Sequence, residues 1–132
     1  MRRRVEFAGL DHVQLAAPAG SEKRARDFFA VVLGLEEIPK PPKLQRRGGV
    51  WFRVGSQELH VGVEDSSEFH PNKRAHPAFE VKNIKELRRI LVSRGVKVQD
   101  DESVGHADRF YTEDPFGNRL EFLQLKSRKL RR

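Results

Sequence analysis

Four side chains with metal-binding chemistry recur at matching places in the two halves of the chain. His12 and His76 each stand near the start of a segment in which apolar and polar residues alternate. His60 and Glu121 each stand inside a later segment of the same kind, 48 and 45 residues further on. Imidazole nitrogens and carboxylate oxygens are the donors that divalent transition metals accept. The pattern therefore predicts one metal site that draws on both halves.

Glu121 carries the strongest single indication of such a site. Its neighbours Leu120 and Phe122 belong to a strand pattern that follows a turn at residues 114–118. A carboxylate buried without a partner destabilises a strand unless a cation or a metal compensates its charge. A sheet with one solvated face gives the same alternation, so Glu121 alone does not separate the two interpretations. Its match with His60 favours the metal site.

One ligand position in the first half has two candidates. Glu58 lies two residues before His60 and so on the same strand face. The alignment of the two halves favours His60, although a one-residue gap near a turn would change this register. His70 and His106 have no counterpart in the other half and lie in predicted loops. We expect both of them at the surface.

Further polar and aromatic residues are predicted to surround the metal and bind a substrate. One of them shares the strand face of His12, and the others form two pairs that each share a face of a neighbouring strand. The two arginines among them can fix an anionic group, although Trp51, like Phe79, also fits a plain apolar core. The predicted substrate-binding residues are Gln14, Trp51, Arg53, Arg109 and Tyr111.

The elements that position these residues form the same series twice: a strand, an amphipathic helix and three shorter strands. Gly34 and Gly95 end the two helices. Ser21 and Asn83 are the predicted N-caps, and Glu86 completes a capping box with Asn83. The order predicts an α+β protein of two tandem βαβββ modules. Its segments are a basic tail at 1–9, modules at 10–63 and 76–125, a linker at 64–75 and a second basic tail at 126–132.

Length and composition limit the class of protein. The chain has 132 residues and no cysteine, so disulfides, thiolate nucleophiles and cysteine-based zinc sites are excluded. No apolar run approaches the roughly 18 residues of a membrane span, and the first residues lack the apolar stretch of a signal peptide. The absence of cysteine suits a reducing compartment. We therefore expect a cytoplasmic protein without a membrane partner.

The net charge of +7 arises in the two tails. Eight of the 26 basic side chains lie at residues 2–4 and 126–132, which hold no acidic residue, and this leaves 18 basic against 19 acidic side chains in the rest of the chain. No aromatic residues alternate with the basic ones as in a surface that stacks bases, so we expect no nucleic-acid partner. The eight residues are Arg2, Arg3, Arg4, Lys126, Arg128, Lys129, Arg131 and Arg132.

Three segments resemble the vicinal oxygen chelate superfamily, which includes glyoxalase I, bleomycin resistance proteins, fosfomycin thiol transferases and extradiol dioxygenases. They are His-Val-Gln-Leu-Ala from His12, His-Pro-Ala-Phe-Glu-Val from His76, and Asp-Pro-Phe-Gly-Asn-Arg-Leu-Glu-Phe from Asp114. The resemblance covers nearly the whole chain outside the tails. It implies a glyoxalase-like fold, in which the paired modules form a cup-shaped mixed sheet around a divalent Zn, Ni, Fe or Mn ion.

The resemblance also implies ligands and a reaction. A His, His, Glu triad of the dioxygenase and thiol-transferase type falls on His12, His76 and Glu121. Glyoxalase I types add a fourth ligand, usually Glu, where this chain has His60 or Glu58. The implied function is that of a metal-dependent lyase or isomerase that chelates vicinal oxygens of a small substrate and stabilises an enediolate-like intermediate, with Glu121 as the catalytic proton shuttle.

Two alternatives to this function stay open: an extradiol-type dioxygenase, and a metal-free protein that binds a drug or metabolite as bleomycin resistance proteins do. The full ligand set argues against the metal-free branch. A homodimer is expected, because each module forms a half-cup whose concave face it cannot cover alone. Whether one site draws on one chain or on two is left open by the linker at 64–75.

Overall fold

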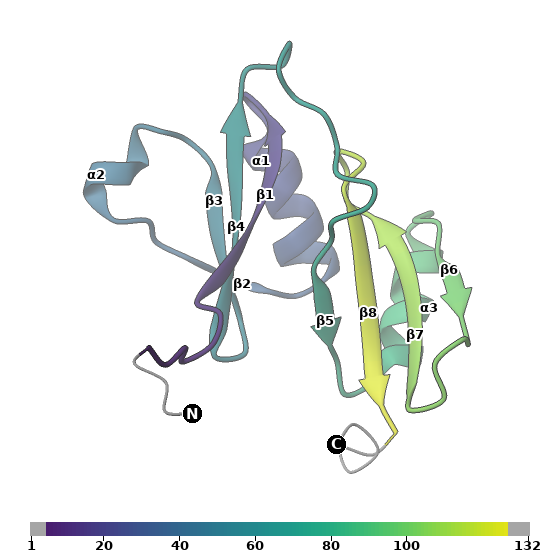
Figure 1. Ribbon diagram of the computed structural model, residues 1–132. Helices are drawn as coiled ribbons and strands as arrows, with labels where there is room; N and C mark the ends of the chain where they lie inside the picture. The colour runs from purple at the N-terminus through teal and green to yellow at the C-terminus, as the bar shows by residue number, and fades with distance from the viewer. Residues whose placement is uncertain (1–4, 127–132) are drawn as a thin grey trace.

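The computed structural model describes residues 5–126, which fold into two modules placed side by side (Figure 1). The first module contains β1 (His12–Pro18), α1 (Glu22–Ala25), η1 (Arg26–Val32), β2 (Glu36–Ile38), α2 (Pro42–Gln45), β3 (Val50–Val54) and β4 (Gln57–Glu64). The second contains β5 (Ala78–Glu80), α3 (Ile84–Ser93), β6 (Gln99–Asp101), β7 (Ala107–Glu113) and β8 (Arg119–Leu125).

Each module has its own four-stranded mixed sheet. The strand orders are β1-β4-β3-β2 and β5-β8-β7-β6, so the two modules have the same topology. The first and last strands of each module run parallel, and the other neighbours run antiparallel. The helix between a module's first two strands supplies the crossover that places its first strand parallel to its last. This arrangement confirms the α+β class and the two tandem modules.

The helices cover one face of each sheet and leave the other face for polar residues. Figure 1 shows α1 and η1 behind the first sheet and α3 behind the second. Apolar side chains from both modules form one core cluster, since burying each of them stabilises the fold by about 1.5–3 kcal/mol. The largest fully buried members include Phe29, Phe52, Leu91, Phe110 and Leu120. Phe79 belongs to the same core and stacks on Phe122.

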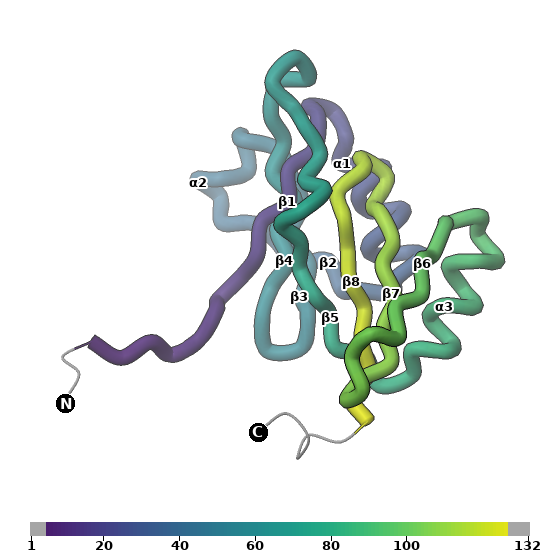
Figure 2. Tube along the Cα trace, turned by 45° about the vertical axis from the view of Figure 1, so that its right-hand side comes forward, coloured from purple at the N-terminus to yellow at the C-terminus, as the bar shows by residue number. Residues whose placement is uncertain are grey.

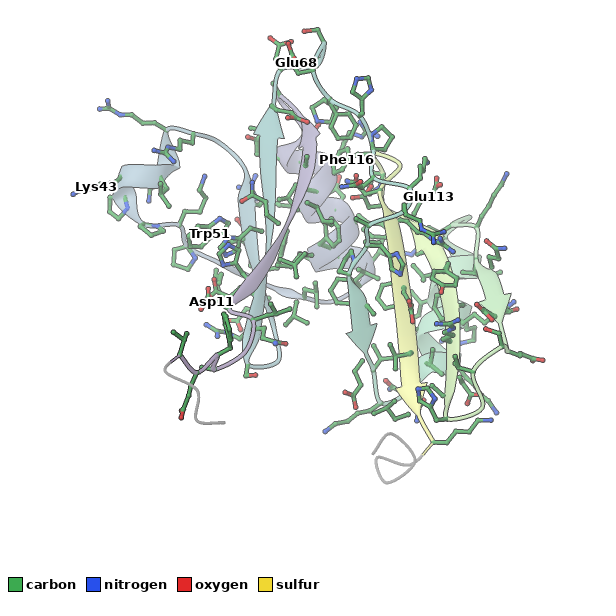
Figure 3. The ribbon with its side chains drawn as sticks, in the orientation of Figure 1. Asp11, Lys43, Trp51, Glu68, Glu113 and Phe116 are labelled. Atoms are coloured by element: carbon green, nitrogen blue, oxygen red, sulfur yellow. The ribbon has the colours of Figure 1, made fainter. Side chains whose placement is uncertain are left out.

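The hairpin between β7 and β8 joins the two modules. Asn118, only 2% exposed, donates through Nδ2 to the carbonyl of Ala16 on β1 at 2.8 Å. Arg24 donates to the carbonyl of Pro115 at 2.8 Å and lies 5.1 Å above the ring of Phe116. Figure 3 shows Phe116 at the end of this hairpin, beside α1. The turn that precedes Glu121 therefore also sets the relative position of the modules.

Three local predictions differ from the structure. The capping box at Asn83 is wrong: the side chain of Asn83 makes no capping bond, the N–H of Ile84 donates to Gln124 on β8, and Glu86 pairs with Arg89. Ser21 likewise stands at the N-cap without a side-chain bond. The sequence pattern predicts a strand at 96–99 and a loop at 100–108, whereas β6 spans Gln99–Asp101 and β7 begins at Ala107. At Asn83 and at β6, contacts with strands that are distant in the sequence override the local preference on which the prediction was based.

Residues 1–4 and 127–132, which hold most of the predicted basic tails, lie outside the described residues. Between residues 5 and 126, no helix is long and apolar enough to cross a membrane.

Candidate metal centre

Strand register places the predicted ligands at equivalent positions in the two modules. In the second module, Glu121 pairs with the residue two positions after His76. In the first module, His60 pairs with the residue two positions after His12. Because side chains alternate across a strand, all four belong to the sheet faces that the helices leave open. His60 therefore has the place in the first module that Glu121 has in the second.

In the second module, His76 and Glu121 form a hydrogen-bonded pair. The Nε2 of His76 lies 3.0 Å from Oε1 of Glu121, and the two side chains are 21% and 10% exposed. On the other side of the ring, Nδ1 of His76 donates to the carbonyl of Arg74 at 2.8 Å. Metal-binding histidines commonly hold their second nitrogen in this way, which fixes the ring and directs the other nitrogen to the metal. The arrangement leaves Nε2 and the carboxylate as one pair of donors.

Arg109 orients the other oxygen of Glu121. Its Nη1 lies 3.4 Å from Oε2 of Glu121, while its Nη2 donates to Asp101 at 2.8 Å and to the hydroxyl of Ser103 at 3.0 Å. Burial lowers the pKa of Arg109, but Tyr111, Asp101 and Glu121 together raise that pKa above its usual value. Among residues 5–126, the Nε of Arg109 is the one buried side-chain nitrogen or oxygen without a partner. It remains a donor for a bound acceptor.

Tyr111 lies opposite Glu121 on β7 and contacts three charged or titratable groups. Its ring meets the ring of His76 edge to face, with centroids 5.5 Å apart. The guanidinium of Arg119 lies 3.9 Å above the Tyr111 ring, and that of Arg109 lies 5.4 Å from it. Cations favour the negative face of an aromatic ring. Tyr111 thus connects the His76–Glu121 pair with two arginines.

In the first module, His60 is held by aromatic stacking. The imidazole, 4% exposed, lies between the indole of Trp51 at 3.8 Å and the ring of His12 at 4.0 Å, and both contacts are nearly parallel. The Nε2 of His60 lies 2.9 Å from Oε1 of Glu58. The Nδ1 of His12 donates to Asp11 at 2.9 Å, so Nε2 of His12 remains available as a donor atom.

The two rivals for the fourth ligand position, His60 and Glu58, lie on the same face, and His60 is the buried one. The side chain of His60 is 6% exposed and that of Glu58 31% exposed. Arg53, opposite Glu58, forms a long contact of 3.5 Å with Glu36, and both of these side chains are largely exposed. Gln14 is exposed and lies across Gly62, where a side chain would collide with its amide.

The chain brings its predicted residues together in two groups, one in each module. His12, His60 and Trp51 form the first group, and His76 and Glu121 belong to the second. No three His, Cys, Asp or Glu side chains between residues 5 and 126 lie close enough to hold one metal ion. Figure 3 shows the separation, with Trp51 on the first module and Glu113 on the second. A single chain therefore separates the candidate ligands into two groups, which we call half-sites.

Several residues of these groups escape prediction from the sequence. Asp11 orients His12, and Asp101 with Ser103 holds Arg109. Asp11 is detectable as the carboxylate directly before a candidate ligand. Arg119 was detectable too, since it lies two residues before Glu121 and so on the same strand face. Asp101 gave no local signal, because its contact depends on the pairing of β6 with β7.

The fold and the two half-sites define a class of protein, and comparison with known families agrees. The family model described as Glyoxalase/Bleomycin resistance protein/Dioxygenase superfamily matches residues 9–122. The chain belongs to this superfamily. A glyoxalase-family protein from Bacillus anthracis has 51% sequence identity and a TM-score of 0.87, with 96% of this chain and 100% of that chain covered. No match was found among curated proteins.

More distant structures share the fold alone. Lactoylglutathione lyase from Agrobacterium tumefaciens has 21% identity and a TM-score of 0.70, with 89% of this chain and 94% of that chain covered. The fosfomycin resistance protein FosX from Listeria monocytogenes has 15% identity and a TM-score of 0.74, with 96% and 100% covered. Proteins with different functions therefore share this scaffold.

Proposed function

We propose that this protein is a metal-dependent enzyme of glyoxalase type, a lyase or isomerase that acts on a small substrate with vicinal oxygens. We further propose that it works as a homodimer, in which the first module of one chain and the second module of the other complete each site. The observation that carries the proposal is the equivalent placement of His60 and Glu121, each with a hydrogen-bonded neighbour, in two half-sites.

The donor set fits a divalent transition metal. The proposed ligands are His12, His60, His76 and Glu121, with Glu58 as the alternative to His60. Both ring nitrogens of His76 face acceptors, the carbonyl of Arg74 and the carboxylate of Glu121. His76 and Glu121 would hold the ion, and its charge would replace the proton that the contact between Nε2 and the carboxylate otherwise requires. The Nδ1 of His12 is likewise held by a carboxylate, as in metal-binding histidines.

The side chains around the proposed centre have separate tasks. A divalent ion bound there would act as a Lewis acid and polarise a substrate oxygen. Glu121 accepts a proton from a carbon next to a carbonyl, since its carboxylate is oriented by His76 and Arg109. The unpartnered Nε of Arg109 donates to a substrate oxygen, and Tyr111, Trp51, Arg53 and Gln14 border the same faces.

The segment before β1 supports a homodimer. Val5, Phe7 and Leu10 are 66%, 92% and 71% exposed. Figure 2 shows this segment projecting away from the body of the molecule. Exposed apolar side chains gathered in this way mark interaction surfaces. The segment leads directly into His12 at the start of β1, which belongs to the first half-site, where the second copy is expected.

Mixing two inactive variants tests this arrangement. His12→Ala removes a ligand from the first module, and Glu121→Gln removes one from the second. If each site combines two chains, half of the randomly assorted dimers are mixed and each has one intact site, so roughly a quarter of the wild-type metal sites return on mixing. The measurement is bound metal per chain after unfolding and refolding the mixture.

The controls are each variant refolded alone and a mixture of wild type with His12→Ala. If the mixture binds no more metal than the two variants refolded alone, then either each site lies within one chain or there is no metal site. The proposal of a metal-dependent enzyme would be contradicted if the wild-type protein retains no divalent metal after purification and its melting temperature does not rise when metal is added. That outcome would favour a protein that sequesters a drug or metabolite.

A further inference from the structure

A cavity of about 810 Å³ lies between η1 and the outer strands of the second module. Tyr111 lines it, and the same ring contacts His76 of the half-site described above. Phe28 from η1 adds an apolar wall, and Gln99 adds an amide. The cavity is therefore connected to the His76–Glu121 pair through Tyr111.

Three cations line this cavity, and two of them have no acidic partner. Lys73 pairs with Glu113 at 2.8 Å. Neither Arg119 nor Lys97 has a carboxylate within ion-pair distance among the described residues. Arg119 is instead held by the ring of Tyr111, at 3.9 Å from its centroid.

The acids near the cavity do not compensate these two charges. Glu113 lies opposite Arg119 on the neighbouring strand, but its carboxylate is held by Lys73. Asp114 is buried and turned inward, since it accepts hydrogen bonds from the N–H groups of Phe116 and Asn118 and from the side chain of Asn118. An uncompensated guanidinium in a partly enclosed cavity attracts an anion, and its planar donors match an oxyanion.

Arg119 differs in this respect from the other arginines on the open sheet faces. Arg109 is held by Asp101 and Glu121, and Arg53 faces Glu36. Arg119 and Glu121 point to the same side of β8, about 7 Å apart along the strand. One small molecule can therefore contact Arg119 and still reach the carboxylate of Glu121.

We propose that Arg119, with Lys97, forms an anion subsite beside the metal centre, and that the substrate is a small organic anion bearing a carboxylate, phosphonate or phosphate group. This inference rests on the proposed function for the position of the reacting atoms. Binding of the anion itself requires only the cavity and its two free cations. Arg119 is thus a specificity-determining residue, and Tyr111 positions its guanidinium.

NMR titration of the metal-free full-length protein with methylphosphonate, and separately with acetate, tests the subsite. We expect saturable shifts at the amides of Gln99, Thr112 and Glu113 in the wild type. Arg119→Gln should weaken the affinity about tenfold, since a charge-assisted contact is lost. Lys97→Gln should weaken it less, and Arg119→Lys should recover part of the loss because it restores the charge.

Arg46→Gln is the matched control, because Arg46 is an exposed arginine just after α2 and outside the cavity. It should bind both probes as the wild type does. The tighter of the two probes identifies the class of anion. Wild-type affinity in Arg119→Gln, equal losses in Arg46→Gln, or no saturable binding of either probe would overturn the subsite. Since no metal is present, these outcomes leave the metal centre to its own test.

Discussion

The two modules share a strand order but hold their candidate donors by different forces. In the first module, the imidazole of His60 is buried between the rings of Trp51 and His12. In the second, the carboxylate of Glu121 is held by hydrogen bonds from His76 and Arg109. Stacking restrains a ring without adding charge, whereas ion pairs stabilise a carboxylate in a partly buried place. Equivalent positions in the two modules thus hold a stacked imidazole in one case and an ion-paired carboxylate in the other.

This difference separates two tasks within the proposed site. The first module offers nitrogen donors on a rigid aromatic support, and the second offers charge and a proton acceptor. A repeat of identical modules would place two carboxylates or two imidazoles at these positions. On the proposed function, this divergence from symmetry would provide both a metal ligand set and a single general base.

The segments that lead into the two modules differ as well. Before β5, the chain packs along β8, with Asn72 bonded to Asn118 and Arg119, and Pro77 bonded to Glu121. Before β1, residues 5–9 extend from the body with Val5 and Phe7 exposed. The segment before β5 is therefore bonded to its own module, whereas the segment before β1 leaves apolar side chains exposed.

The strongest expected effect breaks the connection between the modules. Asn118→Ala removes three side-chain hydrogen bonds of a buried amide, to Ala16, Asp114 and Asn72. We expect a loss of about 3 kcal/mol in the free energy of unfolding, measured by urea denaturation. Asn83→Ala is the matched control. It should change stability by less than about 0.5 kcal/mol, because the side chain of Asn83 makes no capping bond.

The second prediction compares the two carboxylates of the half-sites. Glu121→Gln should weaken divalent metal binding by at least about 100-fold, and Glu58→Gln by about tenfold, because Glu58 acts through His60. Calorimetric titration and the rise of melting temperature with added metal measure both. The reverse order would make Glu58 the ligand. The metal-free binding protein would be favoured if added metal does not raise the melting temperature of the wild type and Glu121→Gln melts at no lower temperature than the wild type.

The third prediction concerns the segment before β1. Phe7→Ser should raise the dissociation constant of the homodimer about tenfold, since an apolar side chain leaves the interface. Sedimentation over a range of concentrations provides the measurement. Val92→Ser, at an exposed apolar residue on α3, is the control and should leave dimerisation unchanged. A wild type that is monomeric at micromolar concentration would contradict the dimer itself.

The smallest effect sharpens the contrast between stacking and ion pairing. Trp51→Leu removes one of the two rings that hold His60 and should lower the free energy of unfolding by about 1 kcal/mol. Metal binding should then become weaker without loss of the general base. Tyr111→Leu, the equivalent change in the second module, should instead alter the anion response through Arg119. Identical behaviour of the two variants would mean that the modules hold their donors alike.

The strand faces of the candidate residues could be predicted because a strand alternates its side chains with a period of two. Trp51 with Arg53, Arg109 with Tyr111, and Glu58 with His60 were each placed on one face from spacing alone. The cap of α3 could not be predicted, since Gln124 lies 40 residues from Ile84 in the chain and competes with the local side chain of Asn83.

The sequence by itself therefore determined the repeat, the strand faces and the choice of candidate ligands, all of which follow from short-range periodicity. Only the tertiary structure decided that the donors separate into two half-sites within one chain. That outcome depends on the hairpin contact of Asn118 with Ala16, which are 102 residues apart, and on Arg24 with Pro115. Such contacts form between the surfaces of two folded modules, so they cannot be predicted from the pattern of neighbouring residues in the sequence.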